Sequence, residues 1–237
     1  MLAYANLIVY FLLMLGTLLS ITTKKLTIAG GLTGGLIGVI LFLGAGLFGL
    51  VMLAAFFFLG TAATSWKKSE KQKLKQEQDT LQRKAGQVVA NAGVPALMGL
   101  LLLIYPEKSS LFLVMLAAGF ASAASDTLSS ELGMVYGKNC YNILTGRRDI
   151  KGLDGVISLE GTLFGVAGSM LIALIYAISF GWNINVFLIC LSGVAGNLFD
   201  SILGASFERK KYLNNDAVNF LNTLFAAVIA LGLVYSI

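Results

Sequence analysis

Eight apolar runs, separated by short polar clusters, account for most of this sequence. A helix needs about 20 apolar residues to cross a bilayer, and each run approaches or reaches that length. Only 12% of the residues are charged, which excludes an ordinary soluble enzyme because soluble domains carry about 25%. We therefore expect an all-α polytopic membrane protein with about eight transmembrane helices, forming a single integral-membrane domain over 1–237. The expected helices are 2–21, 26–43, 47–65, 85–105, 110–133, 157–179, 185–206 and 215–236.

The basic residues predict how these helices are oriented. All of the 17 Lys and Arg residues except Lys108 follow the first, third, fifth or seventh run. Under the positive-inside rule, this alternation places those loops in the cytoplasm and both chain termini outside (N-out/C-out). The main cytoplasmic loops are then 66–84, 134–156 and 207–214, and we interpret the first of them as a solvated, partly helical flap. We attribute the net charge of +5 to contacts with anionic membrane lipids, not to nucleic acid.

Acidic side chains lie inside the apolar runs or at their ends, whereas no Lys or Arg lies inside one. They are Asp126, Glu131, Glu160, Asp200 and Asp216. An ionised carboxylate in the middle of a membrane costs about 2.5–3.5 kcal/mol on insertion scales, so it needs compensation. A bound cation supplies it directly, and oxygen-only ligands favour Mg²⁺, Mn²⁺ or Ca²⁺ over zinc. Protonation or hydrogen bonding between helices is the alternative for any single carboxyl.

Polar residues recur at helical spacing on five of the runs. Residues three or four apart share a helix face, and in each case the polar face lies toward the expected cytoplasmic end. One such face often only joins two helices, but five at the same depth predict a hydrated site. The five sets are Arg83, Gln87 and Asn91; Ser122, Asp126, Ser129 and Ser130; Ser158, Thr162, Gly165 and Ser169; Gly193, Asn197, Asp200 and Gly204; and Asn215, Asn219 and Asn222.

The segment Gly152-Leu153-Asp154-Gly155 leads into the sixth expected helix. The free N–H groups at the start of a helix form a ready phosphate site. Asp154 would repel a phosphate unless a metal ion lay between them, as in kinase and ATPase sites. An equally good interpretation makes Asp154 the N-cap of the helix.

Five motifs in fixed order resemble the integral-membrane phytyl-phosphate kinase family (the domain-of-unknown-function 92 group), which has bacterial and archaeal members. The resemblance extends from about Leu26 to the C-terminus. A more distant similarity to CTP-dependent polyprenol kinases lies in the order of three features: the motif 126–133, a basic loop, and a Ser/Gly-rich start of the sixth helix. Leu153 replaces a Thr of the family pattern, and Ala92 replaces a frequent Gly. The motifs are Gln87-Val-Val-Ala-Asn91, Ala124-Ser-Asp-Thr-Leu-Ser-Ser-Glu-Leu-Gly133, Asp154-Gly-Val-Ile-Ser-Leu-Glu-Gly-Thr162, Gly196-Asn-Leu-Phe-Asp-Ser-Ile-Leu-Gly-Ala205 and Asn215-Asp-Ala-Val-Asn219.

The resemblance implies a membrane kinase that phosphorylates an isoprenyl (phytyl- or geranylgeranyl-like) monophosphate to the diphosphate. It implies CTP, UTP or ATP as co-substrate and Mg²⁺ or Mn²⁺ as cofactor. It also implies a bacterial or archaeal cytoplasmic membrane, with the active site facing the cytoplasm. Because the acceptor is already a phosphate anion, with a second pKa of about 6, a chain without His needs no strong general base.

Taken together, the polar faces and the resemblance predict the site residues. Asp126, Asp200 and Asp154 are the expected catalytic residues. The expected metal ligands are Asp126, Glu131, Asp154 and Asp200. The residues expected to bind substrate or nucleotide are Arg83, Gln87, Asn91, Ser130, Lys138, Lys151, Ser158, Glu160, Asn197, Asn215 and Asn219. For Glu160, holding the start of the sixth helix in place is the alternative role.

Two other functions remain open on the sequence. One is a cytidylyltransferase that forms a CDP-lipid, whose product would contain the nucleotide. The other is an ion-coupled transporter, because carboxylates within a membrane commonly mark ion pathways. Against transport, the polar faces keep to the cytoplasmic half of the helices. The sequence leaves the oligomeric state open, and a homodimer is one option.

Overall fold

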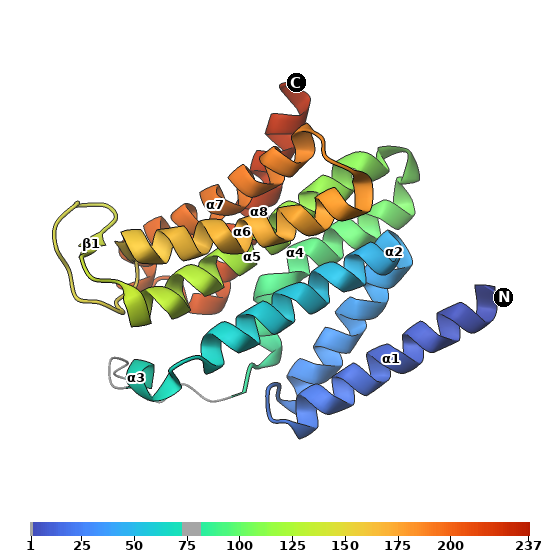
Figure 1. The fold of residues 1–237 in the computed structure, drawn as a ribbon, viewed down its shortest axis with the longest axis horizontal. Helices are drawn as coiled ribbons and strands as arrows, with labels where there is room; N and C mark the ends of the chain where they lie inside the picture. Colours follow the sequence, from blue (N-terminus) through green and yellow to red (C-terminus); the bar gives the residue numbers. More distant parts are fainter. Residues whose placement is uncertain (1, 73–81) are drawn as a thin grey trace.

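Long helices lying side by side form most of the molecule (Figure 1). The computed structural model describes residues 2–72 and 82–237, so residues 73–81 of the predicted flap lie outside the described residues. Two short strands pair antiparallel in the connection between α5 and α6. The elements are α1 (Leu2–Thr22), α2 (Ile28–Ser65), α3 (Lys68–Gln72), α4 (Ala85–Ile104), η1 (Pro106–Lys108), α5 (Ser109–Tyr136), β1 (Cys140–Asn142), β2 (Val156–Ser158), α6 (Leu159–Phe180), α7 (Ile184–Leu203), η2 (Gly204–Glu208) and α8 (Asn215–Tyr235).

Helix α5 is the centre of the bundle and packs against α2, α4, α6, α7 and α8. Every residue from Val114 to Ser125 is buried, and most of them are Ala, Gly or Ser. Such small side chains let neighbouring helices approach closely. On α7, a Cβ added to Gly193 would lie 2.6 Å from the Cβ of Ala121, so this helix spacing requires glycine.

Helix α2 reverses direction at Gly46, as Figure 1 shows. Gly46 has φ 62° and ψ −148°, a conformation that is essentially restricted to glycine. In a straight helix, Gly38 and Leu53 would lie about 22 Å apart at 1.5 Å per residue. Instead, a Cβ on Gly38 would lie 3.7 Å from Cδ2 of Leu53. The two halves of α2 therefore lie side by side, and they correspond to the predicted helices 26–43 and 47–65.

Within the described residues, six helical segments are long and apolar enough to cross a membrane, and the described part of α1, Asn6–Thr22, is a shorter apolar helix. The six are α2, α4, η1 with α5, α6, α7 with η2, and α8. Every predicted helix thus has a counterpart in the structure, and the helical architecture is confirmed. A count of eight crossings, with α1 and each half of α2 crossing once, and the N-out/C-out orientation stay predictions.

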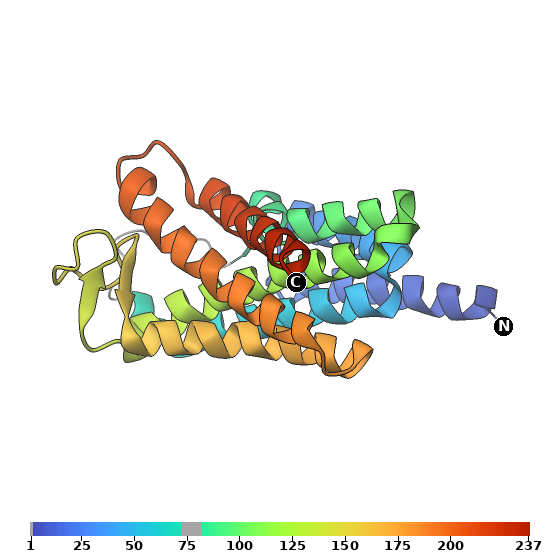
Figure 2. The ribbon, with the colours of Figure 1, turned by 90° about the horizontal axis from the view of Figure 1, so that it is seen from above.

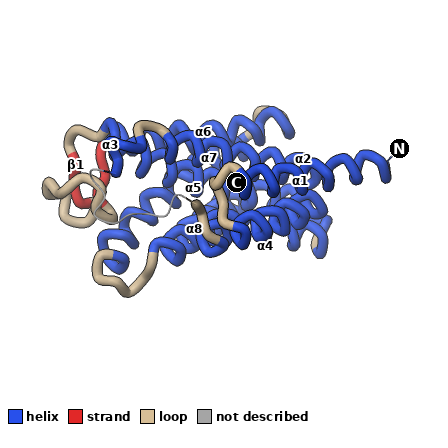
Figure 3. Tube along the Cα trace, turned by 90° about the horizontal axis from the view of Figure 1, so that it is seen from below, coloured by secondary structure: helices blue, strands red, loops and turns tan. Residues whose placement is uncertain are grey.

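The charged connections gather at one end of the bundle. Helix α3, the two strands and the α7–α8 connection lie at this end, on the left of Figures 1 and 2, whereas the N-terminus lies at the other end. We call this the loop-rich end. Figure 3 shows both strands there among helices and loops. The strands correct the all-α prediction, which left 134–156 as a loop. A strand of three residues is too short to give a recognisable alternation of polar and apolar residues.

Candidate active site

Asp126 of α5 and Asp200 of α7 meet near the loop-rich end of the bundle. Their carboxyl groups are in hydrogen-bonding contact. Two carboxylates this close repel each other unless a proton or a cation lies between them. Asn222 of α8 donates from Nδ2 to Oδ2 of Asp200 at 2.7 Å. Three helices therefore converge on this carboxyl pair.

A chain of buried polar groups holds the carboxyl pair in place. Asn222 has no exposed surface, and the hydroxyl of Ser122 donates to its Oδ1 at 3.1 Å. On the same face of α8, Asn219 donates to Oδ1 of Asn215 at 3.0 Å. Buried amides that are fully bonded restrict the positions of their partners, so Asp200 is held in a defined orientation. The spacing of the Asn residues on α8 predicted that they share a face, and they do.

Glycines let α7 approach closely enough to form this site. Gly196 lies one turn before Asp200, and a Cβ on it would lie 2.8 Å from the Cβ of Ser122 and 3.0 Å from the carbonyl oxygen of Asn222. Asn197 is 4% exposed and lies between helices, with Nδ2 2.6 Å from the position of a Cβ on Gly165 of α6. The structure therefore places the Asn197 side chain between α6 and α7, about one turn before Asp200.

Two further carboxylates surround the pair on the loop side. Glu208 of η2 is hydrogen-bonded to Asn215 and acts electrostatically on Asp200 and Asp154. Desolvation raises the pKa of Asp154 above its ordinary value, and the nearby Arg209 partly offsets that shift. Asp154 lies in the turn before β2, so it is not the helix cap that the sequence allowed. It belongs to the electrostatic surroundings of Asp200.

Arg209 fastens the β1–β2 loop to the end of α7. Its Nη1 pairs with the carboxylate of Asp149 at 2.8 Å, and its Nε donates to the carbonyl oxygen of Asp154 at 2.5 Å. The backbone also contacts η2, because a Cβ on Gly204 would lie 2.9 Å from the nitrogen of Gly155. Gly155 has φ 68°, which suits this close approach. The loop is therefore held over the end of α7 next to the carboxyl pair.

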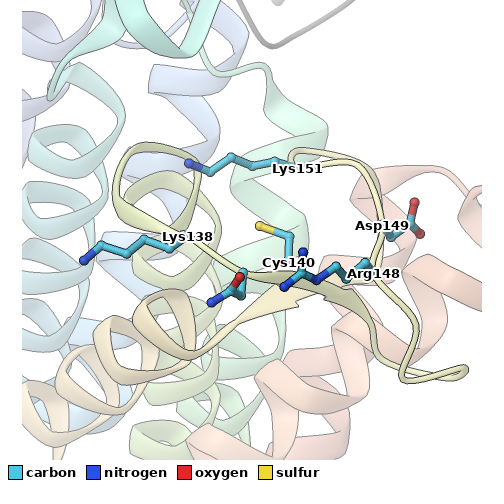
Figure 4. Close-up of a pocket in the computed structure, with 6 residues that line it drawn as sticks. Lys138, Cys140, Arg148, Asp149 and Lys151 are labelled. Atoms are coloured by element: carbon cyan, nitrogen blue, oxygen red, sulfur yellow. The ribbon is translucent and has the colours of Figure 1, made fainter.

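A basic cleft of about 200 Å³ opens beside the strands, and it is lined by Lys138, Asn139, Cys140, Arg148, Asp149 and Lys151. Figure 4 shows the Lys138 and Lys151 side chains extending to the same side, with Arg148 beside Cys140. Asp149 points to the other side in Figure 4, and its carboxylate pairs with Arg209, which directly follows η2. Three cations around one cleft suit a polyphosphate. The structure thus brings together two predicted phosphate-binding residues, Lys138 and Lys151.

Glu131 has a different partner from the one predicted. The ammonium group of Lys71 in α3 pairs with its carboxylate and also donates to the carbonyl oxygens of Ala63 and Thr64 at 2.8 and 2.9 Å. Lys71 therefore joins the end of α2 to α5. Glu131 is therefore paired with a lysine in this structure, and its role as a metal ligand stays a prediction.

Several predicted binding residues have local structural bonds. Ser158 is the N-cap of α6 and accepts from the nitrogen of Gly161 at 3.1 Å. Glu160 accepts from the nitrogen of Lys138 at 3.3 Å, which positions the basic loop and agrees with its alternative role. The remaining three bond within their own helices: the side chains of Gln87 and Asn91 bond to the backbone of Lys84 and Gln87, respectively, and Ser130 bonds to that of Thr127.

Arg83 does not share the α4 face predicted for it. Helix α4 begins at Ala85, and the backbone of Arg83 pairs with Leu26 in an isolated parallel bridge. Its side chain runs along the second half of α2.

The carboxyl pair fits a metal ion that arrives with a nucleotide. In the part of the chain that the structure describes, no group of three or more His, Cys, Asp or Glu residues is placed to hold a metal ion. Mg²⁺ is usually bound through one or two carboxylates, together with substrate phosphates and waters, and not by an all-protein cage. Asp126 and Asp200 match that donor set.

Comparison with known proteins identifies the family. The family described as "Integral membrane protein DUF92" matches residues 11–227. The chain belongs to this family. The family resemblance drawn from the five motifs is confirmed, and the DUF92 chain is an integral membrane protein. No solved structure matches it.

Relatives of this DUF92 protein come from distant organisms. An uncharacterized membrane protein of Methanocaldococcus jannaschii is 37% identical over 201 residues, covering 84% of this chain and 82% of that protein. One from Synechocystis is 35% identical over 204 residues, covering 83% and 78%. The chloroplastic protein VTE6 of Arabidopsis thaliana is 32% identical over 237 residues, covering 97% and 70%.

Sequence reasoning omitted several residues that build this site. Asn222 and Ser122 were on the predicted polar faces, and their spacing could have added them to the site. Arg209 was counted only as a basic loop residue, and Glu208 gave no signal at all. The π-helical turn η2 positions both residues, and no residue pattern in the sequence predicts this turn.

Proposed function

We propose that this DUF92 protein transfers the terminal phosphoryl group of a nucleoside triphosphate to an isoprenyl monophosphate. The observation that carries the proposal is that an acidic pair and a basic cleft lie at the same end of the bundle. The Asp126–Asp200 pair would take the metal ion of a metal–nucleotide, and the basic cleft beside it suits the phosphates. Arg209 connects the two, because it binds the cleft loop and lies next to the acid-rich end of α7.

The reaction needs positioning more than acid–base chemistry. An oxygen of the lipid phosphate forms a bond to the terminal phosphorus, the bond from that phosphorus to the bridging oxygen breaks, and the nucleoside diphosphate leaves. The acceptor oxygen is already anionic at neutral pH, so no residue has to remove a proton. Catalysis then consists of alignment and neutralisation of the charge on the transferred group.

Each part of the site has a role in that reaction. Asp126 and Asp200 would hold Mg²⁺ or Mn²⁺, and that ion would supply positive charge to offset the negative charge of the transferred phosphoryl group. Asn222 orients Asp200. Lys138 and Lys151 bind the nucleotide phosphates in the basic cleft. The nucleotide is CTP, UTP or ATP, and the lipid carries a phytyl- or geranylgeranyl-like chain.

The proposal includes a membrane topology. Counting α1 and each half of α2 gives eight crossings, and the distribution of Lys and Arg then puts the loop-rich end in the cytoplasm. The enzyme would work at the inner surface of a bacterial or archaeal cytoplasmic membrane, where soluble nucleotides are available. A cysteine-accessibility scan of single-Cys variants in inverted and right-side-out vesicles tests this orientation.

The decisive experiment identifies the lipid product. Purified protein in nanodiscs is incubated with Mg²⁺, geranylgeranyl or phytyl monophosphate, and each nucleotide in turn, and the lipid is analysed by mass spectrometry. A prenyl diphosphate that forms with the wild type and is lost in Asp126→Asn is the expected result. A lipid that contains the nucleotide would replace the kinase with a cytidylyltransferase. No product with any donor would overturn the proposal and leave an ion-coupled transporter as the next hypothesis.

A further inference from the structure

The backbone of Arg83 is fixed at the junction of three helices. Its nitrogen donates to the carbonyl oxygen of Lys25 at 3.0 Å, and its carbonyl oxygen accepts from the nitrogen of Thr27 at 3.1 Å. These bonds tie the start of α4 to the α1–α2 connection. The Arg83 side chain therefore leaves from a rigid point at the loop-rich end.

A glycine on α2 makes the space that the Arg83 guanidinium occupies. A Cβ on Gly60 would lie 2.8 Å from Nη2 and 3.2 Å from Nη1. The guanidinium carbon also lies 5.8 Å from the ring centroid of Phe56, one turn earlier, and Nη2 approaches Oγ1 of Thr64 at 3.5 Å, one turn later. Gly60, Phe56 and Thr64 follow one another at four-residue spacing on one face of α2. We call this face the arginine cradle.

The arginine cradle keeps a cation partly out of water. Burial lowers the pKa of Arg83, and the charge of Glu131 acts in the opposite direction. Removing an arginine from water costs free energy, so a cation packed against an apolar helix is a candidate for a functional role. Glu131 also acts electrostatically on Asp126, so one carboxylate is close enough to influence both Arg83 and the carboxyl pair.

Arg83 and the cleft cations have different surroundings, so each suits the phosphate of a different substrate. Lys138 extends from a loop, next to open water. Arg83 lies along α2, whose second half is one of the most apolar segments of the chain. A free nucleotide reaches the loop cations easily, whereas a phosphate attached to a membrane-embedded chain arrives along the helices.

We propose, building on the function proposed above, that Arg83 in the arginine cradle binds the phosphate of the lipid acceptor, while the basic cleft binds the donor. The planar guanidinium presents paired N–H groups that match two phosphate oxygens, and the Thr64 hydroxyl adds a third donor. Gly60 sets the position of the guanidinium, so it is a positioning residue. The isoprenoid chain then extends from this phosphate into the bilayer alongside α2.

The test separates binding of the lipid from binding of the nucleotide. Geranylgeranyl monophosphate binding to protein in nanodiscs is measured without nucleotide, with geranylgeraniol and inorganic phosphate as competitors. Arg83→Gln is expected to weaken lipid-phosphate binding at least about tenfold, because a charged hydrogen-bonded pair is lost. Gly60→Ala is expected to weaken it severalfold, because the methyl group displaces the guanidinium. Gly232→Ala is the matched control, since a Cβ there meets nothing within 4 Å, and it should bind like the wild type.

Kinetics and protein chemistry keep the inference falsifiable if a variant folds poorly. In steady state, Arg83→Lys should raise the KM for the lipid phosphate and leave the KM for the nucleotide within about twofold. A further test needs no substitution. In the wild type, lipid phosphate should protect Arg83 from modification by phenylglyoxal, whereas Arg147, on the exposed loop, should stay reactive. Protection by nucleotide in place of lipid, or unchanged binding in both Arg83→Gln and Gly60→Ala, would overturn the inference.

The outcome also distinguishes this inference from the proposed function. If no donor yields a diphosphate, but the wild type binds the lipid phosphate and Arg83→Gln does not, then the kinase reaction is wrong and the acceptor site stands. If the diphosphate forms but Arg83→Gln and Gly60→Ala both match the wild type in affinity for the lipid, the kinase stands and the acceptor site is wrong.

Discussion

The carboxyl pair and the basic cleft lie at the same end of the molecule but are held in different ways. Asp126 and Asp200 extend from long helices that pack against each other through glycine and alanine, and a buried amide fixes Asp200. Lys138 and Lys151 belong to a loop whose position depends on two short strands and on Arg209. The first region cannot move without disrupting the packing of the helices, whereas the second can be released by breaking a few contacts.

This difference assigns separate tasks to the two regions. A group that must align reacting atoms is best placed on packed helices, because small displacements there cost much free energy. A group that captures and releases a soluble nucleotide is better placed on a loop that can open. Substitutions in the two regions should therefore affect different kinetic constants.

The largest effect is expected in the carboxyl pair. Asp126→Asn and Asp200→Asn should each lower kcat by at least about 100-fold, since each removes a proposed metal ligand. The double variant should be little worse than either single one, because the two residues act as a unit. The rate at which prenyl diphosphate forms measures this effect. Elution of the detergent-extracted protein as a single peak is the control for folding. Additive losses, or rates like the wild type in both single variants, would contradict a shared role.

The next effect concerns the basic cleft. Lys138→Gln and Lys151→Gln should each raise the KM for nucleotide about tenfold and change kcat little, because they remove a charged phosphate contact. The effect should shrink at high salt. Lys108→Gln is the matched control, since this lysine lies in η1 between α4 and α5, far along the chain from the cleft. An equal change in Lys108→Gln would show that the effect comes from overall charge and not from the cleft.

A smaller effect is expected from the tether of the cleft loop. The hydrogen bond from the nitrogen of Ile150, followed by that from Arg209, lowers the pKa of Asp149. A lowered carboxyl pKa means that the tether is complete above the ordinary value of about 3.9 and is lost as the pH falls through the lowered one. Hydrogen exchange in 143–152 should therefore be constant from about pH 8 to 5 once corrected for the intrinsic rate, and rise below about pH 4.

The Asp149→Asn variant provides the comparison for that titration. It should exchange faster at neutral pH, raise the KM for nucleotide severalfold, and show no step below about pH 4. A step of the same size in Asp149→Asn would assign the titration to another group.

The smallest expected effect falls on the start of α6. Ser158→Ala removes the N-cap bond to Gly161 and should cost about 1 kcal/mol of stability. In a protein of this size that lowers the Tm by about 2–4 °C. Thermal unfolding in detergent measures it, and Thr162→Val, which loses a bond to a helix carbonyl and not a cap, should change the Tm less. A raised KM without a change in Tm would instead support the predicted role of Ser158 in binding.

Prediction from the sequence succeeded where a residue's position depends on its own helix. Apolar runs located the helices, and the spacing of Asn215, Asn219 and Asn222 placed them on one face, because helical geometry alone determines both. It failed where position depends on a contact distant in the chain. Glu131 is paired with Lys71, 60 residues away, and Arg83 is pinned to the α1–α2 connection. Nothing within a short window of sequence contains those pairings.

The reversal of α2 at Gly46 has a consequence for how the whole protein inserts. Without it, α2 would be one rod of 38 residues, about 57 Å long at 1.5 Å per residue, nearly twice the thickness of a bilayer core. A helix of that length would cross the membrane once instead of twice, so every later segment would enter from the opposite side. Lys24 and Lys25, which precede α2, would then lie on the opposite side from the 14 Lys and Arg residues of the later basic loops. In the proposed eight-crossing topology, the side of the membrane that each later loop reaches thus depends on this single glycine, and substituting it would affect membrane insertion before it affected catalysis.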